Sequence, residues 1–112
     1  MFAVGYTNKA MTINAIDVKH ISFKNVEKLR RLVIQLLKNP CGKIILDLDG
    51  IKMIDRPAVE VINRLSILAS KQNVIIEFAN VANKVESLFA AADIPIKTTT
   101  ISQAINLKSL KN

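Results

Sequence analysis

Several residue types are scarce in this chain of 112 residues, and each scarcity excludes a class of protein. A single cysteine, Cys41, cannot form an internal disulfide, which excludes a disulfide scaffold and fits a reducing, intracellular setting. Three glycines and three prolines exclude collagen-like and low-complexity chains, and an apolar content of 50% excludes disorder. Tryptophan is absent and aromatic residues make up only 4% of the chain.

Long apolar segments are also missing. The longest uninterrupted apolar run is Leu88 to Ala92, whereas a membrane-spanning helix needs about 20 apolar residues. The first residues do not combine a basic segment with an apolar one, so we expect no signal peptide and a cytoplasmic location. The length predicts one domain over residues 1–112, large enough to bury a core without a disulfide or metal.

Acidic residues are outnumbered, since 16 Lys and Arg stand against nine Asp and Glu, for a formal net charge of +7. The segment from Lys19 to Lys38 holds six of the cations and one acid. Two interpretations are open: a solvated helix face, or a surface that contacts nucleic acid or anionic lipid. No aromatic residues alternate with these cations, so base stacking and hence nucleic-acid binding are disfavoured.

The first part of the chain predicts a hairpin and then a helix. Residues 2–7 and 11–18 are rich in strand-forming residues and flank the turn signal Asn8-Lys9. Helical periodicity then runs from Phe23 to Lys38, with Ser22 as the expected N-cap. The apolar face of this helix contains Val26, Leu29, Val33, Leu36 and Leu37. The polar face contains Lys24, Lys28, Arg31, Gln35 and Lys38.

The second part alternates strands with helices. Residues 43–48 form a nearly continuous apolar run, as expected of a strand buried on both faces. A helix is predicted from Pro57, with an apolar stripe of Ala58, Val61, Ile62, Leu65 and Ala69. After it we predict a strand over 74–78 and a helix capped by Asn80. A strand over 94–98 and a last helix from Thr100 complete the chain. The order predicts an α/β fold with a mixed, mostly parallel sheet of about four to five strands and about four helices.

Catalytic and cofactor signatures are weak. His20, Cys41 and the absence of a glycine-rich loop after a strand leave no metal set and no phosphate cradle of the common kinds, so we expect no cofactor and no enzyme activity. Asp47, Asp49 and Asp55 could form an acidic cluster. A phosphoacceptor pocket, however, needs further carboxylates at the end of the first strand, where Tyr6-Thr7-Asn8 stands.

The segment K-I-I-L-D-L-D-G-I-K-M-I-D-R-P-A-V, residues 43–59, resembles the central part of STAS domains, the family of sulfate transporters and anti-sigma factor antagonists. Asp47 resembles the strand Asp of that family, Gly50 the turn Gly, and Asp55 the Asp that opens the family's Asp-Ser-Ser/Thr-Gly motif. Residues 74–81, 85–94 and 100–105 resemble the later strand and helices, so the resemblance covers nearly the whole chain.

The resemblance implies a STAS-like fold and a regulatory role based on protein binding. In anti-sigma factor antagonists, a hydroxyl residue just after that Asp is phosphorylated by the partner kinase. Here these positions hold Arg56 and Pro57, and Ala58 replaces the family Gly, so no phosphorylation site is expected.

A partner surface is therefore predicted at the start of the second helix, on residues expected to point away from its apolar stripe. They are Asp55, Arg56, Val59, Glu60, Asn63, Arg64 and Ile67. The resemblance implies a protein partner, either an anti-sigma factor-like kinase or a transporter subunit. A homodimer is a further partner left open at this point, as are the alternatives of a transporter's accessory STAS subunit and of a basic module on nucleic acid or anionic lipid.

Overall fold

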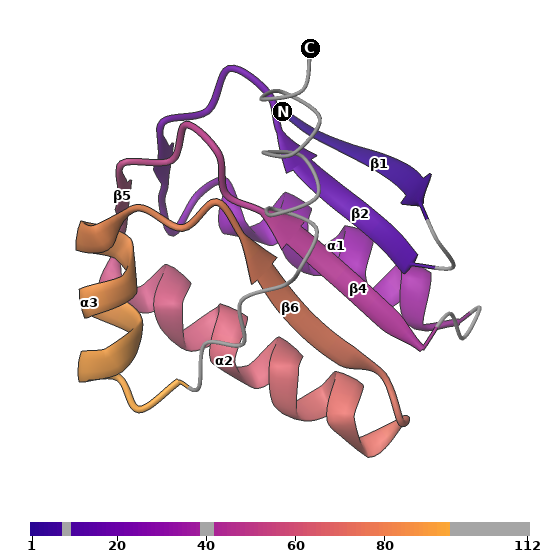
Figure 1. Cartoon of the computed structure of the whole chain (residues 1–112). Coiled ribbons are helices and arrows are strands. Elements are labelled where there is room, and N and C mark those ends of the chain that lie inside the picture. The colour runs from indigo at the N-terminus through magenta and orange to yellow at the C-terminus, as the bar shows by residue number, and fades with distance from the viewer. Residues whose placement is uncertain (8–9, 39–41, 95–112) are drawn as a thin grey trace, which may run out of the picture.

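A computed structural model describes residues 1–7, 10–38 and 42–94 (Figure 1). Its main sheet has four strands in the order β1-β2-β4-β6, namely β1 (Phe2–Thr7), β2 (Ala10–Ala15), β4 (Lys43–Asp47) and β6 (Ile75–Ala79). The β1–β2 pair is antiparallel and the other pairs are parallel. The mixed, mostly parallel sheet predicted from the sequence is thus confirmed.

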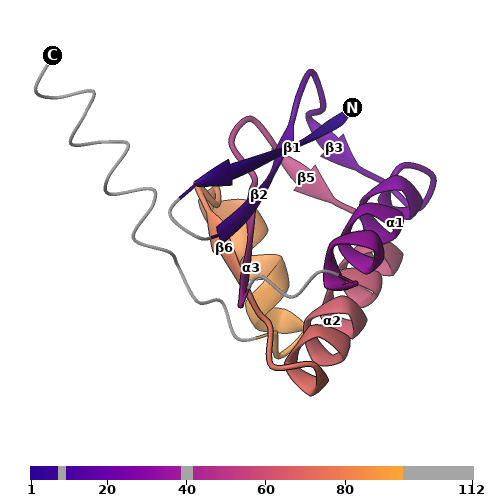
Figure 2. The same ribbon diagram turned by 90° about the vertical axis from the view of Figure 1, so that its right-hand side faces the viewer.

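Three helices and a second, two-stranded sheet complete the described fold. They are α1 (Val26–Leu37), α2 (Arg56–Lys71), α3 (Asn83–Ala91), and the parallel pair of β3 (His20–Ile21) with β5 (Met53–Ile54). Figure 2 shows α1 and α2 side by side against one face of the main sheet. Helix α3 contacts both α2 and β5 (Figure 1).

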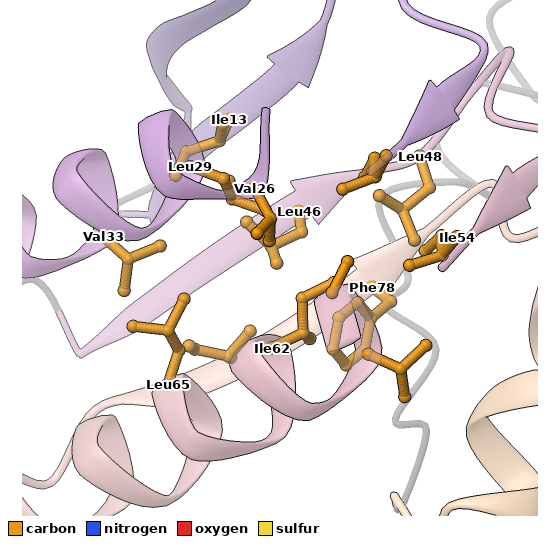
Figure 3. Packing of buried hydrophobic residues seen from close by; sticks show 14 of the residues in the cluster. Ile13, Val26, Leu29, Val33, Leu46, Leu48, Ile54, Ile62, Leu65 and Phe78 are labelled. Atoms are coloured by element: carbon orange, nitrogen blue, oxygen red, sulfur yellow. The ribbon is translucent and has the colours of Figure 1, made fainter. Parts of the chain in front are cut away.

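The core lies between the main sheet and helices α1 and α2 (Figure 3). From β4, Ile44 and Leu46 are buried in the main core cluster, whereas Ile45 belongs to a separate buried cluster with Ala10 and Ala79. Successive strand residues point to opposite faces, so β4 is buried on both of them, as its apolar run predicts. The helices contribute the expected stripes, including Val26, Leu29 and Val33 from α1 and Ile62 and Leu65 from α2.

The opening hairpin begins as predicted but ends early. Strand β1 has the predicted bounds, yet β2 stops at Ala15 and does not reach Val18. Asp17 adopts a positive φ of 58°, which strand geometry excludes, and the chain turns there into β3. The extra strands β3 and β5 are each only two residues long, too short to leave a periodic signal in the sequence.

Both predicted helix caps are wrong in position. The N-cap of α1 is Asn25, not Ser22, because Ser22 Oγ instead accepts the backbone N–H groups of Lys24 and Asn25 at 3.2 and 3.3 Å. Asn25 Oδ1 accepts the Ser22 N–H at 2.7 Å, so the two side chains close a turn just before the helix.

The third helix also starts later than expected. Its N-cap is Ala82, while Asn80 has a positive φ of 56° and donates a side-chain hydrogen bond elsewhere. The predicted strand over 94–98, beyond Ile94, and the predicted helix from Thr100 lie outside the described residues.

The central position of β4 makes its side chains sensitive to truncation. Leu46 is 1% exposed, and we expect Leu46→Ala to lower the free energy of unfolding by about 2–5 kcal/mol, because it deletes buried methyl groups and leaves a cavity. Urea denaturation at equilibrium measures the change. Leu68→Ala is the matched control, since Leu68 is 37% exposed and should lose much less. Equal losses in the two variants would contradict a central β4.

Candidate functional site

The start of α2 is held by the small sheet. Strand β3 pairs with β5 in parallel register, and the backbone N–H of Asp55 donates to the Ile21 carbonyl at 3.0 Å. The Lys52 N–H donates to the Lys19 carbonyl at 2.7 Å on the other side of the pair. These bonds fix the path of the chain up to the first residue of the helix.

The Asp55 side chain makes a hydrogen bond to His20 that the sequence did not predict. Its Oδ1 lies 2.6 Å from His20 Nε2, so the imidazole N–H donates to the carboxylate. Asp55 occupies the N-cap position of α2 but makes no side-chain cap hydrogen bond. Because the two side chains are 51% and 37% exposed, the pair adds little stability and acts mainly to position the strand against the helix start.

His20 is itself fixed through its backbone. The side-chain amide of Asn25 donates to the His20 carbonyl at 2.8 Å, which links β3 to the start of α1. The His20 side chain is exposed, and its contact with Asp55 spans 35 residues and depends on the β3–β5 pairing. No spacing rule could have found it.

The first turn of α2 presents a charged group and no hydroxyl. Arg56 and Pro57 are both exposed, and Pro57 sits in the first turn, where its missing N–H costs nothing. A helix N-terminus carries partial positive charge, and Arg56 adds a full positive charge to it. Arg56 is therefore a cationic group at the start of the helix, next to the Asp55 carboxylate, and its natural complement is an acidic group.

A groove of about 440 Å³ runs beside this surface, between α2 and α3. Its lining residues are Arg56, Val59, Glu60 and Asn63 from α2 and Leu88, Ala91 and Ala92 from α3. Helix α2 thus contributes charged and polar groups, while α3 contributes one larger apolar side chain and two small ones. The groove can hold an amphipathic segment that carries a charged group near the start of α2.

The seven predicted partner-binding residues divide into three groups. Arg56, Glu60 and Asn63 line the groove together, as does Val59. Arg64 and Ile67 are exposed farther along α2 and are not among its lining residues, and Asp55 is half-buried against His20.

Val59 was expected on the exposed side of α2 and is in fact 3% exposed. The contact with α3 widens the buried face of α2 on that side, and Val61, predicted in the stripe, is only half-buried. The lining residues of α3 were missed because an apolar face alone does not show which helix lies opposite.

The three aspartates of the predicted acidic cluster serve separate purposes. Asp47 Oδ1 accepts the Asn80 side-chain amide at 2.9 Å and the Asp49 backbone N–H at 3.0 Å, which joins the ends of β4 and β6. Asp55 is engaged with His20. In the described part of the chain, no three His, Cys, Asp or Glu side chains gather into a group that could hold a metal ion.

The basic face of α1 is exposed but partly neutralised. All its predicted members, from Lys24 to Lys38, point to solvent. Arg30 Nε donates to Glu27 Oε1 at 2.9 Å, and Arg31 Nε lies 3.4 Å from Glu27 Oε2. The hydrogen bond from Arg30 lowers the pKa of Glu27, and the same bond raises the pKa of Arg30. Glu27 therefore stays ionised and offsets part of the local positive charge.

Solved structures of other proteins share this architecture. A provisionally assigned anti-sigma factor antagonist of Thermotoga maritima superposes with a TM-score of 0.77 at 20% identity, covering 94% of this chain and 92% of that one. Phosphorylated SpoIIAA of Bacillus, a cell fate determinant, gives a TM-score of 0.70 at 14% identity, covering 95% and 97%. The murine Solute Carrier 26 family member A9 anion transporter gives 0.58 at 23% identity, covering 77% of this chain and 13% of the transporter.

These similarities establish a shared fold, and no curated protein matches the sequence. No helix in the described ranges is both long enough and apolar enough to cross a membrane. The sequence profile of the STAS domain matches residues 15–104, which include β3, β5 and the complete groove between α2 and α3. The chain therefore belongs to the STAS-domain family.

Proposed function

We propose that residues 1–112 form a single-domain, non-catalytic regulatory module that acts in the cytoplasm. It binds a protein partner at the start of α2 and is not switched by phosphate at that place. The observation that carries this proposal is the groove between α2 and α3, which opens beside a helix start where Arg56 and Pro57 stand in place of hydroxyl residues.

The class of partner is suggested by the structural relatives. SpoIIAA is an anti-sigma factor antagonist known in phosphorylated and unphosphorylated forms. An anti-sigma factor-like kinase is therefore the first candidate partner. In such relatives, phosphate would place negative charge at the helix start, whereas Arg56 here holds a permanent positive charge. The module is accordingly in one fixed binding state.

The side chains define what the partner must offer. Arg56 and Glu60 lie one helical turn apart and have opposite charges, so they favour a partner segment with an acid opposite Arg56 and a base or hydrogen-bond donor opposite Glu60. Ile67 is 50% exposed on the same helix and extends the surface with an apolar contact.

A second candidate function is that of an accessory STAS subunit of a membrane transporter. The part of the murine anion transporter that this chain matches makes up 13% of that transporter. A domain of this fold therefore occurs as a small part of a transporter, which supports this candidate. The two candidates share the α2 surface and differ in the partner, so a binding assay with each class of partner distinguishes them.

Phosphate transfer to this chain should fail. We expect incubation with a kinase-type anti-sigma factor and ATP to leave residues 54–60 unmodified, because Arg56 and Pro57 have no acceptor oxygen. Mass spectrometry of the digested chain checks this, with the kinase's own antagonist as the labelled control. Phosphate on any residue in this range would refute the absence of a switch.

Partner binding should depend on two side chains of α2. Arg56→Glu and Ile67→Asp are each expected to weaken binding at least tenfold, or about 1.4 kcal/mol, through charge reversal and loss of an apolar contact. Isothermal titration calorimetry measures the affinity and thermal melting verifies folding. Lys28→Glu on α1 and Ile75→Asp on β6 repeat the same chemical changes at exposed positions elsewhere. If only the control variants lose affinity, the interface lies on another surface.

The basic face of α1 should not act as a nucleic-acid site. We expect no dissociation constant tighter than about 100 µM for single-stranded or duplex DNA at physiological salt, because Glu27 offsets nearby arginines and no aromatic side chains alternate with the cations. Fluorescence anisotropy across a salt series tests this. A steep salt dependence that disappears in the Lys24→Glu, Lys28→Glu variant would establish the opposite.

A further inference from the structure

Strand β1 is an edge of the main sheet in the described part of the fold, and its own residues lack the features that usually protect an edge. Among the described residues it has a strand neighbour on one side only, β2. Its sequence, F-A-V-G-Y-T, contains no charge and no proline, and its pairing with β2 runs without a bulge. Natural edge strands usually contain charges, prolines or bulges, which prevent pairing with another chain. Val4 and Tyr6 are 42% and 66% exposed on this strand.

The hydrogen bonds to β2 show which backbone groups of β1 face outward. The Ile16 N–H donates to the Met1 carbonyl at 2.7 Å, and the Met1 nitrogen donates to the Ile16 carbonyl at 3.2 Å. Met1 and Ile16 are therefore a hydrogen-bonded pair of the antiparallel ladder. Such pairs alternate along the strand with pairs that make no bonds to each other. Ala3 and Gly5 consequently bond to β2, whereas Phe2, Val4 and Tyr6 direct their N–H and C=O groups to the free edge.

The same three residues share one face of the sheet with their side chains. Val4 lies opposite Ile13, which is buried on the helix side, and residues two apart in a strand point the same way. Phe2 packs partly against the core, while Tyr6 extends into solvent. Along the free edge the side chains are therefore aromatic, aliphatic and aromatic, a pattern that is the same in both directions along the strand.

We propose that this edge binds a second copy of the chain, with the two β1 strands antiparallel and Val4 facing Val4 at the two-fold axis. In this register Phe2 of one copy faces Tyr6 of the other, and each of these pairs exchanges both backbone hydrogen bonds. Aromatic rings then meet across the strands on both sides of the valines, a favourable cross-strand contact. The two main sheets become one continuous sheet.

A second copy fits this edge better than an unrelated strand because the pattern is complementary to itself. An antiparallel pair centred on Val4 brings every outward backbone group opposite a matching group, which is the requirement of an isologous interface. Each chain has a net charge of +7, but β1 itself is uncharged, so its residues bring no like charges together at the contact.

The strand at the opposite edge of the described sheet, β6, differs because it contains the acid Glu77. Helices α2 and α3, whose residues line the groove, lie away from β1 (Figure 1), so a dimer leaves the groove open. The interface is a single strand pair, smaller than a standard stable interface, so association in the micromolar range or weaker is expected.

Charge substitutions at the two-fold axis test this arrangement. Sedimentation equilibrium of the full chain should show dimer increasing with concentration up to about 1 mM. Val4→Lys and Val4→Glu should each raise the dimer dissociation constant at least tenfold, because like charges then face each other. An equimolar mixture of the two variants should recover a heterodimer, since Lys faces Glu. Ile75→Lys, at an exposed isoleucine of β6, should leave the dimer unchanged.

Hydrogen exchange provides a second measurement that needs no variant. Raising the concentration of the unmodified chain should slow exchange of the Phe2, Val4 and Tyr6 amides, while the inward-facing amides of Ala3 and Gly5 stay unchanged. A chain that stays monomeric at 1 mM would overturn the proposal. So would charged Val4 variants that dimerise like the parent, a mixture that fails to recover, or a dimer lost in Ile75→Lys.

Discussion

The burial of β4 on both faces is the constraint on which the rest of the structure depends. With Ile44 and Leu46 on the helix side and Ile45 on the other, this strand is buried on both faces. It pairs with β2 on one side and β6 on the other, both in parallel register. Parallel neighbours require crossover connections, and these place α1 and α2 on the same face, where their apolar stripes meet.

The candidate site follows from this arrangement through the segment after β4. Asp47 ties the end of β4 to Asn80 at the end of β6, so the loops that follow both strands start from fixed positions. The first loop forms β5 against β3 and delivers Asp55 to His20 at the start of α2. The loop after β6 leads into α3, whose contact with α2 forms the groove. Backbone pairing, more than side-chain ion pairs, holds this surface rigid.

The first turn of α2 illustrates how a STAS scaffold keeps its shape while its chemistry changes. Pro57 and Arg56 are compatible with a helix start, because proline needs no N–H there and the arginine side chain extends into solvent. The groove beside them depends on Val59 packing and on α3, and neither needs a hydroxyl. The shape of this surface is therefore independent of a hydroxyl residue at the start of α2.

Much of the fold and the presence of a family motif could be predicted from the sequence alone. Periodicity and breaker residues indicated β1, β4, α1, α2 and the strand before α3, because burial on one or two faces leaves a pattern in consecutive residues. The absence of a hydroxyl group at Arg56 and Pro57 could also be predicted, because it follows directly from the identity of these two residues. The local rules failed where another hydrogen bond competed, with near neighbours at Ser22 and across the sheet at Asn80.

Only the tertiary structure decided which residues form the site. The His20–Asp55 contact depends on two-residue strands that bury little and leave no periodic signal. Val59 appeared exposed on an isolated helix and became buried because α3 covers that side of α2. The outward register of β1 likewise depends on which residues bond to β2. Contacts between elements distant in the chain are set by packing of the whole domain, and a sequence pattern records only that a residue is buried, not what buries it.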